Sequence, residues 1–294
     1  MKYFRIEKNN KPNLIINYSN NFGFNITEYS SYINTVEILS IEANSQNISR
    51  SEYINQFITN NSIKKIPLDK VIEKNKLLLP FIPDEVWAAG VTYKNSEFER
   101  KRESSTPDIY AKVYNAKRPE IFFKSTGSRL VAPNQKIGIR SDSKWNVPEA
   151  ELAVILLNNE IFGYSIGNDM TSREIEGENP LYLTQAKIYD KSCSIGPCII
   201  DAESISNYEK FNINCKIIRN EKTIFNAASS VKSMNKSIPY LIKWLKQSNT
   251  LPIKSAFLTG TGIVPPPEFT LLENDQISIS INEIGTLNNS VIKV

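Results

Sequence analysis

One run of residues, Trp145–Leu157, limits the possible folds of this chain more than any other. It is apolar along most of its length, carries Glu149 and Glu151, and reads as one strand. Side chains two apart on a strand share a face, so the two carboxylates project together, about 6–7 Å apart along the backbone. The opposite face is apolar and consists of Ala150, Leu152, Val154 and Leu156. Because Ala153 and Ile155 make the glutamate face apolar as well, we expect both faces to be covered.

Two carboxylates in a covered space need a metal ion, a proton or a basic partner. A hairpin through Asn158–Asn159 leads to a second predicted strand, and Asp169 lies where that strand ends. Three carboxylates with no imidazole or thiolate nearby are typical of a hard-cation site, for Mg²⁺, Mn²⁺ or Ca²⁺, with Mg²⁺ favoured. The alternative interpretation is a pair of exposed glutamates near a strand end, since most glutamates are exposed.

The chain contains no histidine among its 294 residues. Histidine-dependent hydrolase triads, histidine-ligated zinc and histidine general bases are therefore excluded within one chain. The three cysteines have no C-x-x-C spacing, and we interpret them as core thiols. The net charge of +4 arises from scattered basic residues, so nucleic-acid binding is not expected.

The first residues lack the apolar segment of a signal peptide, and no run approaches 18 apolar residues. These observations predict a soluble, cytoplasmic protein that does not bind a membrane.

The chain is long enough for one large or two modest domains. We expect a small mixed module over residues 1–80 and a second domain over 81–294, with a proline-containing junction near Leu79–Asp84. Short strands separated by turns dominate the pattern, which favours a β-rich sandwich or roll.

Several segments carry more specific expectations. Val36–Ile41 is β-prone, a helix is expected from near Ser51 to Asn60, and Ser237 is the expected N-cap of a helix with apolar residues at helical spacing. The charged run Ser96–Ser105 reads as a solvated helix, and the polar run Met170–Pro180 as a loop.

The turn Thr259–Gly262 matches neither the dinucleotide-binding nor the P-loop pattern. A tight turn that needs permissive backbone angles is one interpretation, and a cradle of amides and hydroxyls for a substrate carboxylate is the other. The simplest interpretation of Lys187 is an exposed surface lysine, since most lysines are exposed.

Several motifs together resemble the fumarylacetoacetate hydrolase superfamily, in the same order and from about residue 86 to the end of the chain. They are Gly90-Val91-Thr92-Tyr93, Arg118-Pro119-Glu120, Pro148-Glu149-x-Glu151, Asn168-Asp169-Met170-x-Ser172-Arg173, Lys187 and Thr259-Gly260-Thr261. Within that superfamily, the runs Arg173–Leu183 and Gly260–Pro266 are most similar to the branch of 2-keto-3-deoxy-D-arabinonate dehydratases.

The resemblance implies an α+β, β-rich fold in which a mixed β-roll follows a small N-terminal α+β domain, and a homo-oligomer, either dimer or tetramer. It also implies Mg²⁺-dependent conversion of a 2-keto-3-deoxy sugar acid, a small 2-keto acid, to 2,5-dioxopentanoate. The implied site residues are Glu149, Glu151 and Asp169 for the metal, Glu120 and Lys187 as the acid/base pair, and Tyr93 and Thr261 for the substrate.

Two departures from the pattern bear on this interpretation. The hydrolases of the superfamily have a catalytic histidine shortly after the position of Tyr93, where this chain has Lys94, Asn95 and Ser96. Ala150 stands where the dehydratases have a second proline, which alters backbone stiffness more than the ligands. Two alternatives stay open: hydrolysis or decarboxylation of an acylpyruvate-type substrate on the same metal, and non-catalytic binding of a sugar acid.

Overall fold

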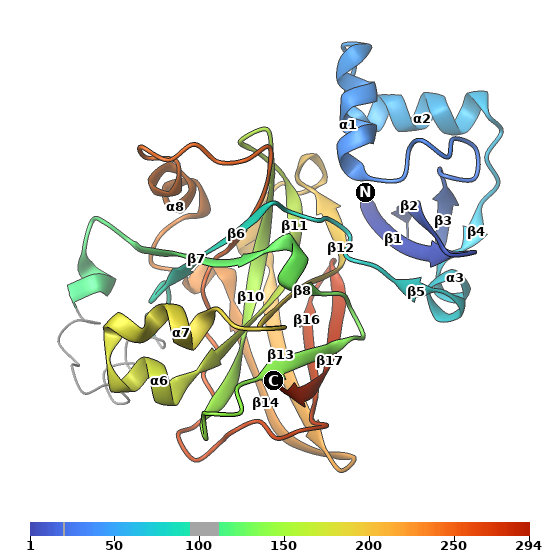
Figure 1. Cartoon of the computed structure of the whole chain (residues 1–294). Coiled ribbons are helices and arrows are strands. Elements are labelled where there is room, and N and C mark those ends of the chain that lie inside the picture. The colour runs from blue at the N-terminus through green and yellow to red at the C-terminus, as the bar shows by residue number, and fades with distance from the viewer. Residues whose placement is uncertain (20, 95–111) are drawn as a thin grey trace.

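A long antiparallel hairpin forms the centre of the molecule in the computed structural model, which describes residues 1–19, 21–94 and 112–294 (Figure 1). Its strands are β10 (Asn146–Leu157) and β11 (Glu160–Ser172). Asn158 and Asn159 join them with φ angles of 52° and 65°, as a primed hairpin turn requires. The predicted strand and hairpin are confirmed, although the second strand continues beyond Asp169.

Twelve of the described strands belong to one sheet around this hairpin, with the path β4-β3-β2-β1-β12-β11-β10-β15-β6-β7; β5 pairs with β1, and β8 with β12. The bounds of the strands not yet given are β1 (Lys2–Lys8), β2 (Lys11–Ser19), β3 (Phe22–Asn25), β4 (Ile66–Pro67), β5 (Lys76–Leu77), β6 (Glu85–Gly90), β7 (Glu120–Thr126), β8 (Leu130–Val131), β12 (Cys193–Asp201) and β15 (Lys254–Leu258).

A second sheet in the described part of the chain has the order β14-β13-β16-β17-β9. Its strands are β9 (Lys136–Ile139), β13 (Asn212–Arg219), β14 (Lys222–Ser230), β16 (Gln276–Ile281) and β17 (Gly285–Lys293). The apolar face of β10 that contains Leu152 and Val154 belongs to the same core cluster as the inward side chains of this sheet. Ala153 and Ile155, on the other face, belong to a second cluster that also contains N-terminal residues. The strand is thus covered on both faces, as predicted, and every residue of β10 is buried.

The N-terminal residues form β1 to β5 together with three helices, α1 (Val36–Ser45), α2 (Arg50–Asn60) and α3 (Leu68–Lys74), in the upper right of Figure 1. Strand β1 pairs with β12, so the large sheet runs through both parts of the chain. The division between residues 80 and 81 stays a prediction.

The predicted strand over Val36–Ile41 is wrong, because this segment begins α1. The Thr35 side chain accepts a hydrogen bond from the backbone of Ile38, and the buried residues recur at helical spacing. Capping and a helically spaced buried face outweigh the β propensity of the branched side chains. The helix expected over residues 51–60 is confirmed as α2.

The prediction of a loop over the polar run Met170–Pro180 is also wrong, because this segment contains the end of a strand and a short helix. Strand β11 extends to Ser172, whose hydroxyl accepts a hydrogen bond from Ile175 N at 3.2 Å and caps α6 (Arg173–Glu178). Helices α6 and α7 (Leu183–Lys187) lie side by side in Figure 1. The helix capped by Ser237 is confirmed as α8 (Ile238–Leu245). The helix predicted over residues 96–105 lies outside the described residues.

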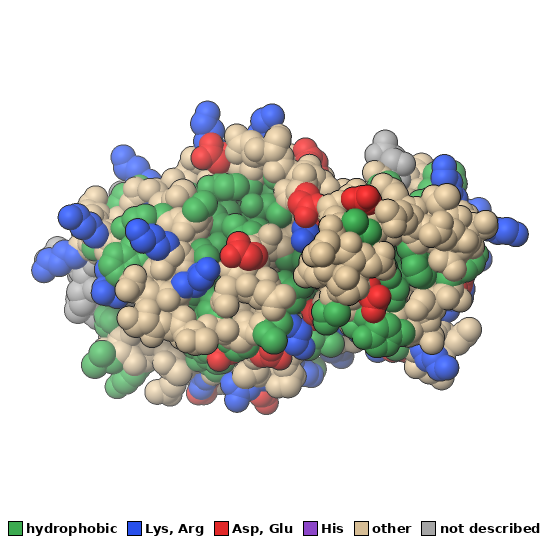
Figure 2. Space-filling model, turned by 90° about the horizontal axis from the view of Figure 1, so that it is seen from above, with side chains coloured by type: hydrophobic (Ala, Val, Ile, Leu, Met, Phe, Trp, Pro, Cys, Tyr) green, Lys and Arg blue, Asp and Glu red, His purple; other side chains and the backbone are tan. Residues whose placement is uncertain are grey.

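On the face shown in Figure 2, Lys and Arg side chains are dispersed among acidic ones and form no continuous basic stripe. Among the described residues, no helix has both the length and the apolar character that crossing a membrane requires.

Candidate metal centre and active site

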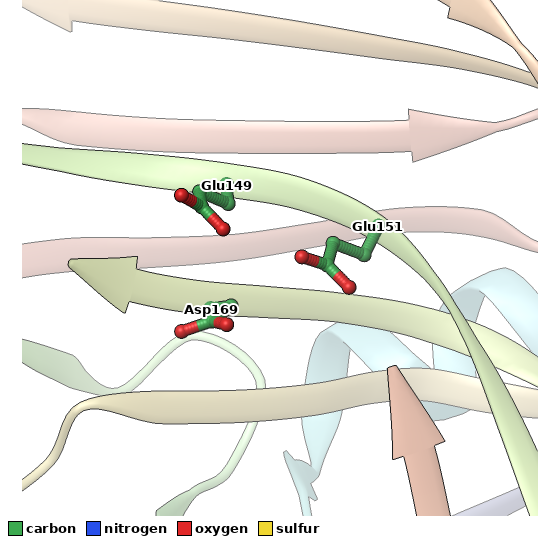
Figure 3. A group of neighbouring side chains, drawn as sticks. All are labelled: Glu149, Glu151 and Asp169. Carbon is green, nitrogen blue, oxygen red and sulfur yellow. The ribbon is translucent and has the colours of Figure 1, made fainter. Parts of the chain in front are cut away.

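Three carboxylates meet on the central hairpin. Glu149 and Asp169 are direct partners in the β10–β11 ladder, and Glu151 lies two residues further along β10 on the same face. One oxygen from each of the three lies within 4.8 Å of the others, and the side chains point toward one another (Figure 3). All three are buried, which contradicts the alternative of exposed glutamates near a strand end.

The ammonium of Lys187, at the end of α7, reaches the same carboxylates. Its Nζ lies 2.7 Å from Glu149 Oε2, 3.2 Å from Asp169 Oδ2 and 2.7 Å from the hydroxyl of Thr171. Lys187 is buried, so the surface-lysine interpretation is wrong. The structure brings the sequence-predicted lysine to the carboxylate cluster, while its role in proton transfer stays a prediction.

A second buried lysine, Lys124 of β7, was missed by the sequence analysis. Its Nζ lies 2.6 Å from Asp169 Oδ1 and donates to the backbone oxygens of Met170 at 2.9 Å and Lys187 at 2.5 Å. Lys124 lies on the same strand as Glu120, at the register shift between Phe123 and Ser125 in the pairing of β7 with β6.

The guanidinium of Arg173, at the start of α6, connects two acidic groups. One terminal nitrogen lies 3.0 Å from Glu149 Oε1, and the other 3.2 Å from Glu176 Oε2. Glu176, on the same helix, is also buried. Both residues stand in motifs that carry the family resemblance, but the sequence analysis gave neither a role in the site because their segment was expected to be a loop.

Among the buried side chains of this site that the structure describes, carboxylates outnumber cations. The carboxylates are Glu149, Glu151, Asp169 and Glu176, and the cations are Lys124, Lys187 and Arg173. Glu151 Oε2 accepts a hydrogen bond from Gly260 N at 2.6 Å, whereas Glu151 Oε1 has no hydrogen-bond partner in the described part of the chain.

Burial is the largest cause that raises the pKa of Glu151 well above its usual value, and the charges of Asp169 and Glu149 add to it. Lys187 and the Gly260 amide act in the opposite direction. A divalent cation would relieve this excess of negative charge, and an all-oxygen ligand set suits Mg²⁺. The residues present therefore fit a magnesium ion.

Glu120 lies at the junction of two cavities. The inner one, of about 20 Å³, is lined by Glu149, Lys187, Gly260 and Thr261 among others, and the outer one, of about 420 Å³, by Arg118, Pro180 and Leu183 among others. Glu120 and Glu176 line both. The carboxylate of Glu120 lies so close to Gly90 that a Cβ there would be 2.2 Å from Glu120 Oε2. Only glycine fits at position 90 with Glu120 in this place.

The Thr259–Gly262 turn faces the same site. Gly260 has φ of +88°, and a Cβ on it would lie 2.1 Å from Thr92 Oγ1. Its amide donates to Glu151, so the turn holds one of the carboxylates directly. Thr261 lines the inner cavity, and its Oγ1 accepts a hydrogen bond from Ile263 N at 3.1 Å. Contact between Thr261 and a substrate stays a prediction.

Tyr93 is buried, and Glu151 contributes to its electrostatic environment: burial first, and then the Glu151 charge, raise the pKa of the phenol. Tyr93 is not among the described residues that line the two cavities. Its substrate-binding role therefore stays a prediction.

Val91, two residues before Tyr93, lines the inner cavity with φ of +51°. A branched residue rarely adopts this angle, and such strain clusters at functional sites.

Comparisons with known proteins agree with this arrangement. The family model "Fumarylacetoacetate (FAA) hydrolase C-terminal" matches residues 85–292. The chain is 48% identical over 216 residues to a probable 2-keto-3-deoxyxylonate dehydratase of Haloferax volcanii, covering 74% of this chain and 75% of that protein. It is 40% identical over 224 residues to the 2-dehydro-3-deoxy-D-arabinonate dehydratase of Saccharolobus solfataricus, with the same two coverages.

A solved structure of 2-keto-3-deoxy-D-arabinonate dehydratase complexed with magnesium and 2,5-dioxopentanoate superposes with a TM-score of 0.83 at 31% identity. It covers 100% of this chain and 99% of its own, so the likeness includes the N-terminal residues that the family model leaves out. The predicted α+β, β-rich fold is confirmed. The chain belongs to the fumarylacetoacetate hydrolase family.

Proposed function

We propose that this protein is a hydro-lyase that removes water from a 2-keto-3-deoxypentonate and releases 2,5-dioxopentanoate. The observation that carries the proposal is the buried cluster of Glu149, Glu151 and Asp169, whose oxygens lie within 4.8 Å of one another beside Lys187. The names of the two similar dehydratases support the substrate class. In a pentonate whose C2 hydroxyl is oxidised to a ketone and whose C3 hydroxyl is removed, C4 is the single stereocentre that remains. The D-arabinonate and D-xylonate derivatives are therefore one compound.

Glu149, Glu151 and Asp169 would hold Mg²⁺, which the similar solved structure contains. When bound, the ion supplies Lewis-acid polarisation of the carboxylate and 2-oxo group of the substrate. Glu151 Oε1, which has no hydrogen-bond partner among the described residues, would be one of the oxygen ligands of the ion. Mn²⁺ and Ca²⁺ have the same preference for oxygen ligands and are the alternatives.

Glu120 and Lys187 are the proposed acid/base pair, since both line the inner cavity. The contacts of Lys187 with Glu149 and Asp169 favour its ammonium form, which makes it the better proton donor in this arrangement. The half-buried carboxylate of Glu120 then accepts the C3 proton. Lys187 protonates the C4 hydroxyl as its C–O bond breaks, and water leaves. A proton shift from C5 to C3 converts the resulting enone to the C4–C5 enol, which becomes 2,5-dioxopentanoate when its hydroxyl proton is lost and C4 is protonated.

The test is incubation of the protein with 2-keto-3-deoxy-D-arabinonate and Mg²⁺, followed by quantification of the products. We expect one aldehyde, 2,5-dioxopentanoate, per substrate consumed, and loss of turnover in excess EDTA that is restored by Mg²⁺. Pyruvate or CO₂ as product would contradict dehydration and favour hydrolysis or decarboxylation. Ligand binding without any product would favour a sugar-acid binding protein. A cytoplasmic location and a homo-oligomeric state also stay predictions.

A further inference from the structure

Each of the three clustered carboxylates has one oxygen in contact with a cation or an amide of the protein. The pairs are Asp169 Oδ1 with Lys124 Nζ at 2.6 Å, Glu149 Oε1 with a terminal nitrogen of Arg173 at 3.0 Å, and Glu151 Oε2 with the amide of Gly260 at 2.6 Å. The three partners lie on β7, on α6 and in the turn after β15, all outside the central hairpin. We call these three carboxylate oxygens the anchored oxygens.

The other oxygen of each carboxylate is not held by these partners. Lys187 Nζ contacts two of them, Glu149 Oε2 at 2.7 Å and Asp169 Oδ2 at 3.2 Å, so both oxygens face one point. The third, Glu151 Oε1, is buried and has no hydrogen-bond partner in the described part of the chain. The three side chains point toward one another (Figure 3). The arrangement therefore separates one inward oxygen from one anchored oxygen on each carboxylate.

Lys124 is held in a fixed position. An ammonium has three N–H donors, and Lys124 Nζ contacts three oxygens: Asp169 Oδ1 and the backbone oxygens of Met170 at 2.9 Å and Lys187 at 2.5 Å. The side chain is fully buried, so bulk water does not compete for these donors. Lys124 is not among the described residues that line the two cavities. It therefore acts on a bound ion through Asp169, as a positioning residue.

Mg²⁺ and Ca²⁺ differ in what they require from a carboxylate. Mg²⁺ demands a near-ideal octahedron and usually keeps several waters, so one oxygen from each carboxylate suits it. Ca²⁺ takes about six to eight oxygens in a flexible geometry and accepts both oxygens of one carboxylate. The ion pair with Lys124 keeps Asp169 Oδ1 from serving as a second ligand. Anchoring this oxygen therefore disfavours the larger ion.

We propose that Lys124 raises the selectivity of the metal centre for Mg²⁺ over Ca²⁺: by holding Asp169 Oδ1, it limits Asp169 to one oxygen ligand. This inference rests on the metal site of the proposed function and not on the reaction. It assigns a role to a buried lysine that the proposed proton transfers do not use.

An effect of charge alone gives a different result. The ammonium of Lys124 repels any divalent ion nearby, so its removal should strengthen the binding of Mg²⁺ and of Ca²⁺ by similar factors. Loss of the anchor acts unequally, because Ca²⁺ gains more than Mg²⁺ from the second oxygen of Asp169. The ratio of the two dissociation constants separates these accounts.

The ratio is measured by calorimetry of Mg²⁺ and Ca²⁺ binding to the full chain, in the native protein and in Lys124→Met. Methionine fills the buried space but holds no carboxylate oxygen. We expect the dissociation constant for Mg²⁺ divided by that for Ca²⁺ to rise roughly tenfold, the usual size of the effect when a partner of a ligating carboxylate is removed. The control is Ser192→Ala, which removes the 3.1 Å hydrogen bond from the Ser192 hydroxyl to the Lys187 oxygen but leaves the ion pair of Lys124 with Asp169 in place. This variant should retain the native ratio.

Melting temperatures show which variants are folded. In a folded Lys124→Met protein, an unchanged or lower ratio would overturn the inference, because charge or stability alone would then account for the role of Lys124. If Lys124→Met does not fold, the native protein is crystallised with Ca²⁺. Asp169 should then contribute Oδ2 alone within about 2.3–2.6 Å of the ion, and coordination through Oδ1 would overturn the inference.

The proposed function is tested separately on the same samples. A tenfold change in the ratio without any dehydration of 2-keto-3-deoxy-D-arabinonate by the native protein would refute the proposed function and leave the selectivity standing. Dehydration by the native protein together with an unchanged ratio in Lys124→Met would overturn the inference alone. A native protein that binds neither ion would overturn both the inference and the proposed metal site.

Discussion

Glu149 and Asp169 stand directly opposite each other in the β10–β11 ladder, and Lys187 Nζ contacts both, at 2.7 Å and 3.2 Å. Like charges at paired positions of a sheet destabilise it. Here the two carboxylates are buried, and ion pairs with the ammoniums of Lys187 and Lys124 offset their repulsion. A third carboxylate, Glu151, places an oxygen within 4.8 Å of theirs.

Mg²⁺ should stabilise the folded protein, because it binds the carboxylates only when they are held together. At a concentration one hundred times its dissociation constant, a ligand adds about 2.7 kcal/mol to the free energy of unfolding. We expect a rise of roughly 5 °C in melting temperature by differential scanning calorimetry, measured against an EDTA-treated sample. In Glu151→Gln the rise should be largely lost. A melting temperature of the native protein that does not respond to Mg²⁺ would remove the metal from the proposed site.

Glu120→Gln should abolish proton transfer and leave the metal centre intact, because Glu120 is not one of the three clustered carboxylates. We expect kcat to fall by a factor of about 10² to 10⁴. Mg²⁺ affinity, measured by calorimetry, should stay at the native value. Loss of Mg²⁺ binding together with activity would show instead that Glu120 supports the metal centre.

Lys124→Met should destabilise the fold strongly. The ammonium of Lys124 is fully buried, and its removal takes away the 2.6 Å ion pair of Asp169 Oδ1 and the hydrogen bonds to the backbone oxygens of Met170 and Lys187. The Lys187 oxygen keeps the Ser192 hydroxyl as a donor at 3.1 Å. Breaking a buried ion pair from one side costs about 3–5 kcal/mol. Urea unfolding in EDTA measures this loss, and Lys222→Met, at an exposed position of β14, serves as control with a change within about 0.5 kcal/mol. A loss for Lys124→Met as small as that of the control would mean that the contacts of Lys124 do not stabilise the site.

The hydrogen bond between Tyr3 of β1 and Asp201 of β12 should contribute less to the free energy of unfolding at alkaline pH. Tyr3 donates a hydrogen bond to Asp201 Oδ2 at 2.5 Å, and burial, followed by the Asp201 charge, raises the pKa of the phenol well above 10. A raised pKa in the folded state means that the contribution of Tyr3 is complete below pH 10. It is lost as the pH rises from 10 toward the pKa of the folded state.

The measurement is the free energy of unfolding of native protein and Tyr3→Phe between pH 8 and pH 11. At pH 8 the variant should be less stable by about 1.5–3 kcal/mol, since a hydrogen bond to a charged group is lost. Above pH 10 the difference should shrink by up to about 1.4 kcal/mol per pH unit. Tyr32→Phe, at an exposed position, is the control and should follow the native curve. A difference that does not change with pH would contradict the assignment.

The sequence could predict the carboxylate cluster because its geometry is local. The two-residue period of a strand places Glu149 and Glu151 on one face, and the turn at Asn158–Asn159 brings the end of β11 alongside them. The register shift between Ile155 and Leu156, which the sequence analysis did not predict, decides that Asp169 rather than Asn168 stands opposite Glu149. The same reasoning failed for Val36–Ile41, where a Thr35 cap and a helically spaced buried face outweighed β propensity. It failed again where Ser172 caps α6 within a polar run.

The sequence by itself determined the central strand, its covered faces, the absence of imidazole chemistry and, through the collinear motifs, the family. Only the tertiary structure decided that Lys124, Arg173 and Glu176 belong to the site, since nothing in a linear pattern distinguishes a buried charge from an exposed one. Each lies on an element outside the central hairpin, β7 or α6, and is buried because that element packs over the carboxylates. The physical reason is that the protonation and partner of a charged group depend on what surrounds it in space.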